Sequence, residues 1–195
     1  MTEAIILKSM LFDMENPSGF DPYSLLTRLI VPRPIAWVSS VGKEGIFNLA
    51  PFSFFNLICD EPPIVILSIS RKDDGCRKDT AENILHTGDF VINLVSVEHV
   101  QKVMLTSEEF PPEVDEFKVA GLTPTKVHKV KSPRVAEAKA WLECVFLKQE
   151  ELFGYDLIFG RVVLVGAESL DYKVLKPVGR LSESFCELIE INQEK

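Results

Sequence analysis

The segment from Asn48 to Asn56 combines polar and aromatic side chains in a pattern that suits a flat, partly polar ligand. Its sequence is Asn-Leu-Ala-Pro-Phe-Ser-Phe-Phe-Asn. Amide and hydroxyl groups can hydrogen-bond the polar edge of a heteroaromatic ring, and Phe52, Phe54 and Phe55 can contact its apolar end. The alternative is a buried strand whose asparagines cap its ends and whose phenylalanines belong to the core.

A second polar cluster, Arg-Lys-Asp-Thr-Ala-Glu-Asn at positions 77–83, has the composition of a helix start. Asp79 is predicted to cap this helix and Gly88 to end it. The first amides of a helix are unpaired and carry the positive end of its dipole, so a phosphate is stabilised there. Lys78 or Arg77 would add a full charge, and Thr80 and Asn83 offer further donors. The alternative is a capped surface helix with solvated basic residues.

A flat polar ring and a phosphate are the two ends of a flavin nucleotide, which is the ligand that these segments predict together. Trp37 lies shortly before the first segment and would stack on or flank the ring, unless it is a core tryptophan. Ser68 interrupts the apolar run 64–70 and is read either as ligand-facing or as bonded to backbone.

Other chemistries lack their sequence patterns. No GxSxG, GxGxxG or GxxxxGK[ST] occurs, so neither a nucleophile elbow nor a dedicated nucleotide domain is predicted. NAD(P)H would therefore dock only transiently, onto a bound flavin. The three histidines and four cysteines are dispersed without metal-ligand spacing, which predicts reduced cytoplasmic thiols and no metal site.

Composition fits one globular domain. The chain has 195 residues, of which 46% are hydrophobic and 26% charged. Its formal net charge of −8 argues against non-specific binding of nucleic acid. No signal-peptide pattern and no run of about 18 apolar residues occurs, so neither export nor a membrane span is predicted.

Hydrophobic patterning predicts a mainly β protein. The range 135–152 has helix-favouring residues, yet its apolar residues alternate with a period of two, so a strand is predicted. Gly160, inside another β-rich run, suggests a bulge or bend. Most connections are too short for crossovers, which favours a closed or partly closed antiparallel barrel. Strands are predicted at 35–41, 46–55, 64–70, 89–96, 135–152 and 155–165. Helical segments are predicted at 23–27, between Asp79 and Gly88, and at 97–105, with a loop at 108–115.

Four motifs in this order resemble the flavin reductase-like, FMN-binding split-barrel family, most closely its flavoredoxin-like branch. They are PRPIAWVSS at 32–40, NLAPFSFFN at 48–56, EPPIVILSI at 61–69 and KDTAENI at 78–84. The resemblance implies a six-stranded antiparallel Greek-key split barrel with a few short flanking helices. It also implies a homodimer with FMN near the subunit interface. The expected domain spans 23–181, with an N-terminal extension at 1–22 and a tail at 182–195.

The resemblance also assigns residues to the cofactor site. Trp37, Val38 and Ser39 would lie against the flavin. The phosphate side would be held by Lys78, Thr80 and Asn83. The ring, the ribityl chain and the remaining pocket wall would be held by Asn48, Ser53, Phe54, Asn56, Ser68 and Arg180. The chain departs from the family at 182–186, where Ser-Glu-Ser-Phe-Cys replaces a glycine-rich, tyrosine-containing continuation.

The implied activity is hydride transfer from NAD(P)H to the flavin N5, with electrons passed on to an acceptor, a partner monooxygenase or a redox protein. Because such chemistry belongs to the cofactor, no catalytic acid or base is expected. One alternative is an FMN electron carrier without NAD(P)H turnover. Another is an interaction protein on the same barrel whose cofactor pocket has been lost, against which the intact 48–56 and 78–83 segments count.

Overall fold

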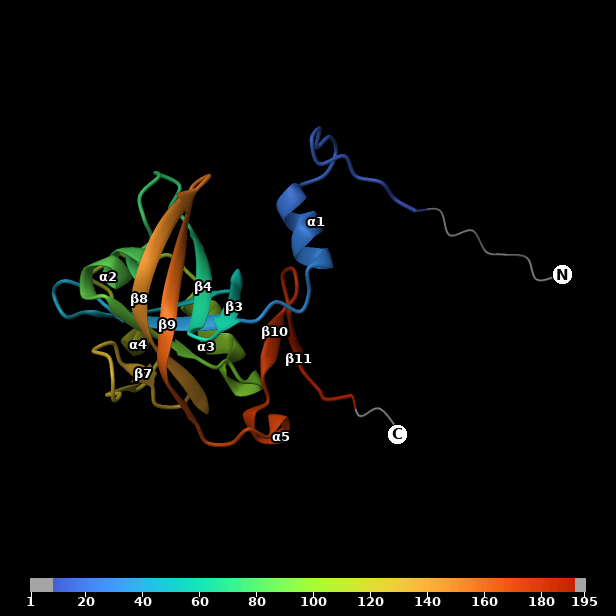
Figure 1. Cartoon of the computed structure of the whole chain (residues 1–195). Coiled ribbons are helices and arrows are strands. Elements are labelled where there is room, and N and C mark those ends of the chain that lie inside the picture. Colours follow the sequence, from blue (N-terminus) through green and yellow to red (C-terminus); the bar gives the residue numbers. More distant parts are fainter. Residues whose placement is uncertain (1–8, 192–195) are drawn as a thin grey trace.

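The central sheet has seven antiparallel strands in the order β2-β1-β5-β8-β9-β4-β3, in a computed structural model that describes residues 9–191 (Figure 1). Its strands are β1 (Ala36–Val41), β2 (Phe47–Phe52), β3 (Phe55–Asp60), β4 (Pro63–Ser70), β5 (Asp89–Asn93), β8 (Ala140–Leu152) and β9 (Tyr155–Ala167). Two small sheets pair β6 (Pro124–Thr125) with β7 (Arg134–Val135), and β10 (Val178–Arg180) with β11 (Phe185–Glu187).

The path of the chain makes this sheet curl. Strands β2 and β3 lie at opposite edges of the sheet, yet only Ser53 and Phe54 separate them in sequence. The three Cα–Cα steps from Phe52 to Phe55 span at most about 11 Å, so the two edges must approach each other there. The backbone N–H of Ser68 in β4 donates to the carbonyl of Phe54 at 2.8 Å, which extends the β3–β4 pairing into the turn. The predicted split-barrel class is confirmed, with seven strands in the main sheet where the family resemblance implied six.

One strand prediction was wrong in its extent. The sequence predicted a single strand over 46–55, whereas the structure has β2 and β3 with a turn between them. The chain stops pairing with β1 at Phe52 and begins pairing with β4 at Phe55. Apolar and aromatic residues continue through the turn, so periodicity alone could not locate the break.

The long hairpin of β8 and β9 confirms the strand predicted at 135–152 from residue 140 onward, whereas residues 136–139 form a turn after β7. Each strand has 13 residues, and Phe153 and Gly154 form the turn with positive φ. Gly160 lies beside a register irregularity between Phe146 and Lys148, as the predicted bulge requires. A Cβ at Gly160 would come within 2.4 Å of the Phe90 ring, so close packing also requires glycine here.

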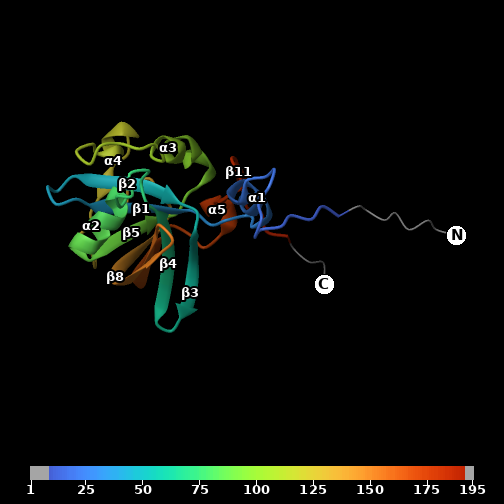
Figure 2. The ribbon, with the colours of Figure 1, turned by 90° about the horizontal axis from the view of Figure 1, so that it is seen from above.

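Short helices flank the sheet, as Figure 2 shows from above. They are α1 (Pro22–Leu29), α2 (Asp79–Thr87), the 3-10 turn η1 (Val97–His99), α3 (Val100–Leu105), α4 (Glu116–Val119) and α5 (Tyr172–Leu175). Gly88 ends α2 with φ of +78°, as predicted. The predicted cap of α2 was wrong: Lys78 is the N-cap residue and offers no side-chain hydrogen bond, while Asp79 pairs with Lys72.

The core lies on both faces of β1. Trp37 packs with Leu49, Phe117 and the α3 region on one face, whereas Val38 packs with the second cluster around Phe90 on the other. All five of these side chains are completely buried. A strand buried on both faces reads as a continuous apolar run, which is how Ile35–Val38 appears in the sequence.

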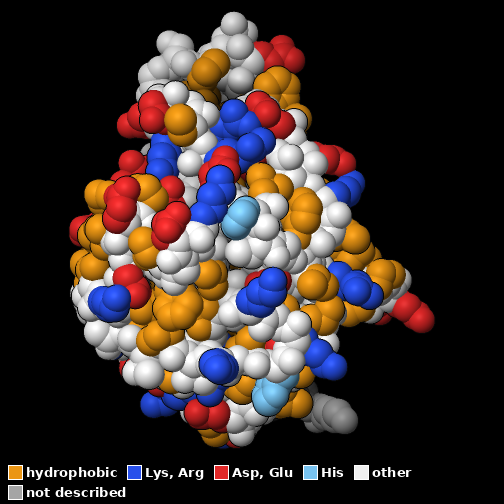
Figure 3. Space-filling model, turned by 90° about the vertical axis from the view of Figure 1, so that its left-hand side faces the viewer, with side chains coloured by type: hydrophobic (Ala, Val, Ile, Leu, Met, Phe, Trp, Pro, Cys, Tyr) orange, Lys and Arg blue, Asp and Glu red, His pale blue; other side chains and the backbone are white. Residues whose placement is uncertain are grey.

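The N-terminal helix α1 and hairpin β10–β11 lie side by side at one end of the molecule (Figures 1 and 2). Strand β11 falls inside the 182–195 segment that was predicted to be a tail, and it pairs with β10. On the face drawn in Figure 3, basic side chains are interspersed with acidic ones and form no continuous basic patch. None of the helices within residues 9–191 is long and apolar enough to cross a membrane.

Candidate functional site

Four of the predicted site residues meet at one hollow. Ser53 and Phe54 reach it from the β2–β3 turn, Ser68 from β4, and Lys78 from the start of α2. The hollow measures about 170 Å³. Further lining comes from Tyr23, Pro51, Phe52, Ser70 and Tyr155. We call Ser53, Phe54, Ser68, Lys78 and Arg180 the open rim.

Arg180 lines a second hollow that adjoins the first. This hollow measures about 160 Å³, and the two share Tyr23, Pro51 and Ser53 as lining residues. Phe185 of β11 also lines it, with its ring 4.6 Å from the Arg180 guanidinium. The divergent 182–186 segment therefore contributes directly to the wall of the candidate site.

Three other predicted residues form a closed hydrogen-bond network beside the open rim. Asn48 Oδ1 accepts from Thr80 Oγ1 at 2.8 Å and from Ser40 Oγ at 3.1 Å. Asn83 Nδ2 in turn donates to Ser40 Oγ at 3.2 Å. Asn48 Nδ2 donates to Glu116 Oε1 at 2.8 Å. We call Ser40, Asn48, Thr80, Asn83 and Glu116 the inner network.

Glu116 is the ionisable member of the inner network and is only 6% exposed. Burial raises its pKa, although hydrogen bonds from Asn48 and the Leu49 amide oppose the rise. A hollow of about 380 Å³ lies beside Asn48, Asn83 and Glu116. Its other lining side chains include Glu44, Asp79, Glu82 and Glu113, so an anionic ligand would be repelled there.

The remaining predicted residues lie away from the open rim. Trp37, Val38 and Ser39 are completely buried, so their side chains have no surface to offer a ligand. Trp37 Nε1 donates to Thr106 Oγ1 at 2.9 Å, and Ser39 accepts from Asn93 at 3.1 Å. Trp37 therefore matches its alternative reading as a core tryptophan, and the side chains of Val38 and Ser39 are buried as well. Asn56 is exposed on edge strand β3, where its Oδ1 accepts from the next backbone amide.

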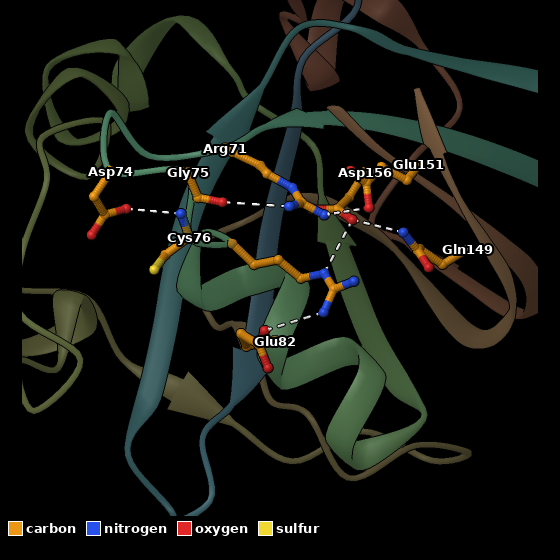
Figure 4. Close-up of polar contacts among 9 residues, drawn as sticks. Arg71, Asp74, Gly75, Cys76, Glu82, Gln149, Glu151 and Asp156 are labelled. Atoms are coloured by element: carbon orange, nitrogen blue, oxygen red, sulfur yellow. Dashed lines mark hydrogen bonds and ion pairs between the residues drawn. The ribbon is translucent and has the colours of Figure 1, made fainter. Parts of the chain in front are cut away.

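The loop between β4 and α2 contacts the β8–β9 hairpin through Arg71, which reaches Asp156 and Glu151 (Figure 4). Asp156 of β9 is 1% exposed and receives Arg77 Nε at 3.1 Å and Gln149 Nε2 at 2.7 Å. Arg71 Nε lies 3.6 Å from its other oxygen. Arg77 therefore faces this buried carboxylate. Of the two basic residues considered for the phosphate, Lys78 is the one that lines the hollow.

Sequence reasoning missed the aromatic residues that line the two hollows. They are Tyr23, Tyr155 and Phe185. Tyr23 lies more than 100 residues before the other two in the sequence, and no local motif marks any of the three. Exposure identifies Tyr23, whose side chain is 59% exposed although it is large and apolar. Within residues 9–191, no group of three or more His, Cys, Asp or Glu side chains could hold a metal ion.

Comparisons with known proteins agree with this fold. The chain is 44% identical over 184 residues to an uncharacterized protein of Aquifex aeolicus, covering 90% of this chain and 94% of that one. The structure superposes on nitrilotriacetate monooxygenase component B from Bacillus cereus with a TM-score of 0.88, at 34% identity, covering 96% and 100% of the two chains.

A second solved structure, 2-nitrobenzoate 2-nitroreductase NbaA of Pseudomonas fluorescens, matches with a TM-score of 0.82 at 26% identity, covering 95% of each chain. The model of the flavin reductase like domain matches residues 27–175, which include every predicted site residue except Arg180. This chain therefore belongs to the flavin reductase-like family.

Proposed function

We propose that this protein is an FMN-binding oxidoreductase that transfers electrons from NAD(P)H through the flavin to an acceptor. The observation that carries the proposal is the meeting of Ser53, Phe54, Ser68 and Lys78 at one hollow. Two short hydroxyl side chains, an aromatic ring and one cation are the groups that a phosphorylated heteroaromatic ligand requires. The family membership of the chain supports the same ligand.

Within this proposal the open rim divides into two parts. Lys78 and the first turn of α2, which has no side-chain cap, would hold the phosphate. Ser53, Ser68 and Phe54 would hold the ring and ribityl chain, with Arg180 on the adjoining wall. The inner network would fix the position of α2, because Thr80 bonds Asn48 of β2.

Bound FMN would supply the redox chemistry by accepting hydride from NAD(P)H at N5 and passing electrons onward. The protein would bind and orient the ring and leave one side of it accessible. No acid or base is assigned a role.

A homodimer is part of the proposal. Hollows of about 170 and 160 Å³ are small against the roughly 300–1,000 Å³ of typical ligand sites, so a further wall is needed. Phe54, Leu57 and Ile58 of the β3 region are 38%, 58% and 51% exposed, and such an apolar group suits a second copy. By analogy with the monooxygenase component that it resembles, the protein would serve a partner monooxygenase or another redox protein.

The test is a visible absorption spectrum of the purified protein with and without added FMN. Flavin bands that stay with the protein after desalting and are bleached by NADH or NADPH are the expected result. Bands that only dithionite bleaches would replace the proposal by the electron carrier. No retained flavin, together with no change in melting temperature at 100 µM FMN, would contradict FMN binding.

A further inference from the structure

Arg33 is a buried cation that has no acidic partner among residues 9–191. Its side chain is 5% exposed and lies where α1, the β2–β3 turn and β10–β11 meet. One terminal nitrogen donates to the carbonyl of Thr27 at 2.7 Å, and the other donates to that of Leu181 at 2.9 Å. Within residues 9–191 it forms no ion pair. Buried charges are ordinarily paired, so this one is unusual.

The same guanidinium determines the direction of a hydrogen bond at the open rim. Arg33 Nε donates to Ser53 Oγ at 3.3 Å, so the serine oxygen acts as the acceptor. A hydroxyl has one proton, and that of Ser53 has no acceptor among the residues that the structure describes. Because Ser53 lines both adjoining hollows, its proton is free to point toward a ligand. Arg33 thereby makes Ser53 a hydrogen-bond donor.

Positive charge accumulates at this place in a chain of net charge −8. Arg33 and Arg180 are joined by two backbone hydrogen bonds, of 3.0 and 2.8 Å. Arg180 also forms no ion pair within the described part of the chain, and lies over the Phe185 ring instead. Burial lowers the pKa of Arg33, which Tyr23 opposes and Arg180 reinforces. No carboxylate contributes to that balance.

We propose that Arg33 is a positioning residue that acts through Ser53 to favour a ligand ring carrying negative charge. The inference rests on the proposed FMN site and says how that site would change the reduction potential of its ligand. Oxidised flavin that takes up two electrons and one proton, here from dithionite and solvent, gains one negative charge on its ring. A fixed cation and an aligned donor should bind that form more tightly than the oxidised form.

The experiment measures the midpoint potential of bound FMN, together with the affinities for FMN and riboflavin, in four variants. Arg33→Gln removes the charge, and Arg33→Lys keeps it. Ser53→Ala removes the donor, and Arg28→Gln removes an exposed arginine from α1 as a matched control. Arg33→Gln should lose about tenfold in the preference for reduced over oxidised FMN, which lowers the potential by about 30 mV for a two-electron couple.

Arg33→Lys keeps the charge, so its midpoint potential should lie close to that of the wild type. Ser53→Ala should lower the affinities for FMN and riboflavin alike. Arg28→Gln should match the wild type. Equal potentials in wild type and Arg33→Gln would overturn the proposal, as would an effect on FMN that riboflavin does not share, since the cation would then act on the phosphate. If Arg33→Gln does not fold, the test rests on Arg33→Lys and Ser53→Ala. Flavin affinities and a midpoint potential equal to those of the wild type in both variants would then overturn the proposal. Failure of the wild type to bind either flavin would instead remove the proposed function.

Discussion

The inner network and the open rim lie next to each other but differ in how their polar groups are paired, except that Lys78 of the rim lies 3.5 Å from Glu109. In the inner network, each polar side chain has a partner from another segment, as Asn48 has in Thr80 and Glu116. At the open rim, Ser53 has a proton without an acceptor and Arg180 has a charge without a counterion within residues 9–191. The comparison teaches that satisfied polar groups hold a site in place, whereas unsatisfied ones are available to a ligand.

The largest expected effect concerns Trp37, a completely buried residue that lies away from the open rim. Trp37→Ala should lower the free energy of unfolding by about 3–5 kcal/mol, because it removes a completely buried side chain and its bond to Thr106. Urea denaturation measures the loss, and Trp141→Ala, at a half-buried position, should cost less. FMN affinity of the folded fraction should stay within about threefold. A loss of FMN affinity with an unchanged free energy of unfolding would show that Trp37 belongs to the cofactor site.

Next in size is Thr80→Val, which keeps the shape of the side chain and removes its hydroxyl. We expect a loss of about 1–2 kcal/mol in unfolding free energy, because Asn48 Oδ1 loses its 2.8 Å donor in a buried place. Thr80→Ser retains the hydroxyl and should restore most of the stability. If Thr80→Val weakened FMN binding more than tenfold while melting normally, the inner network would have to be counted as ligand-binding.

Lys78→Ala tests the open side. We expect about tenfold weaker FMN binding, or ~1.4 kcal/mol, with little change in the melting temperature of the apoprotein. Fluorescence titration at low and high salt measures this, and the difference should shrink as salt screens the charge. Lys43→Ala, which removes an exposed charge from the β1–β2 turn, is the matched control. Unchanged FMN affinity in Lys78→Ala would remove the phosphate assignment.

The smallest expected effect concerns His99, which packs on Trp37 with ring centroids 5.9 Å apart. Burial lowers the pKa of His99 below its ordinary value of 6.5. The unfolded chain therefore binds a proton more readily than the folded one, and acidification through about pH 6.5 should reduce stability. Melting curves at pH 8 and pH 5.5 should show a larger drop in wild type than in His99→Gln, by on the order of 1 kcal/mol. An equal drop in both would show that this histidine does not contribute.

The sequence predicted elements best where a local pattern and the tertiary structure agree. The alternation in 135–152 identified β8, and Gly88 identified the end of α2. It failed where long-range pairing decides, as at Ser53, where the chain leaves one sheet edge for the other. Asp79 has a side chain suited to capping, but in the structure it forms an ion pair with Lys72.

The site was predictable in part for the same reason. Motif resemblance selected segments correctly, yet it could not tell which side of a strand faces a hollow. Ser39 and Ser53 are both serines in polar–aromatic contexts, but Ser39 points into the core and Ser53 lines the two adjoining hollows. That difference depends on the curl of the sheet. Tyr23 and Phe185 both line the second hollow, where Arg33 joins α1 to the β10–β11 hairpin.

The buried Asp156 carboxylate links the tip of the β8–β9 hairpin to the loop that carries Lys78 (Figure 4). Two arginines of that loop converge on one acid, so neither segment can change length independently of the other. An insertion in the turn at Phe153–Gly154 would change the position of Lys78, although the turn itself lines neither adjoining hollow. The hairpin tip and the β4–α2 loop are thus expected to vary together among relatives of this protein, as one unit.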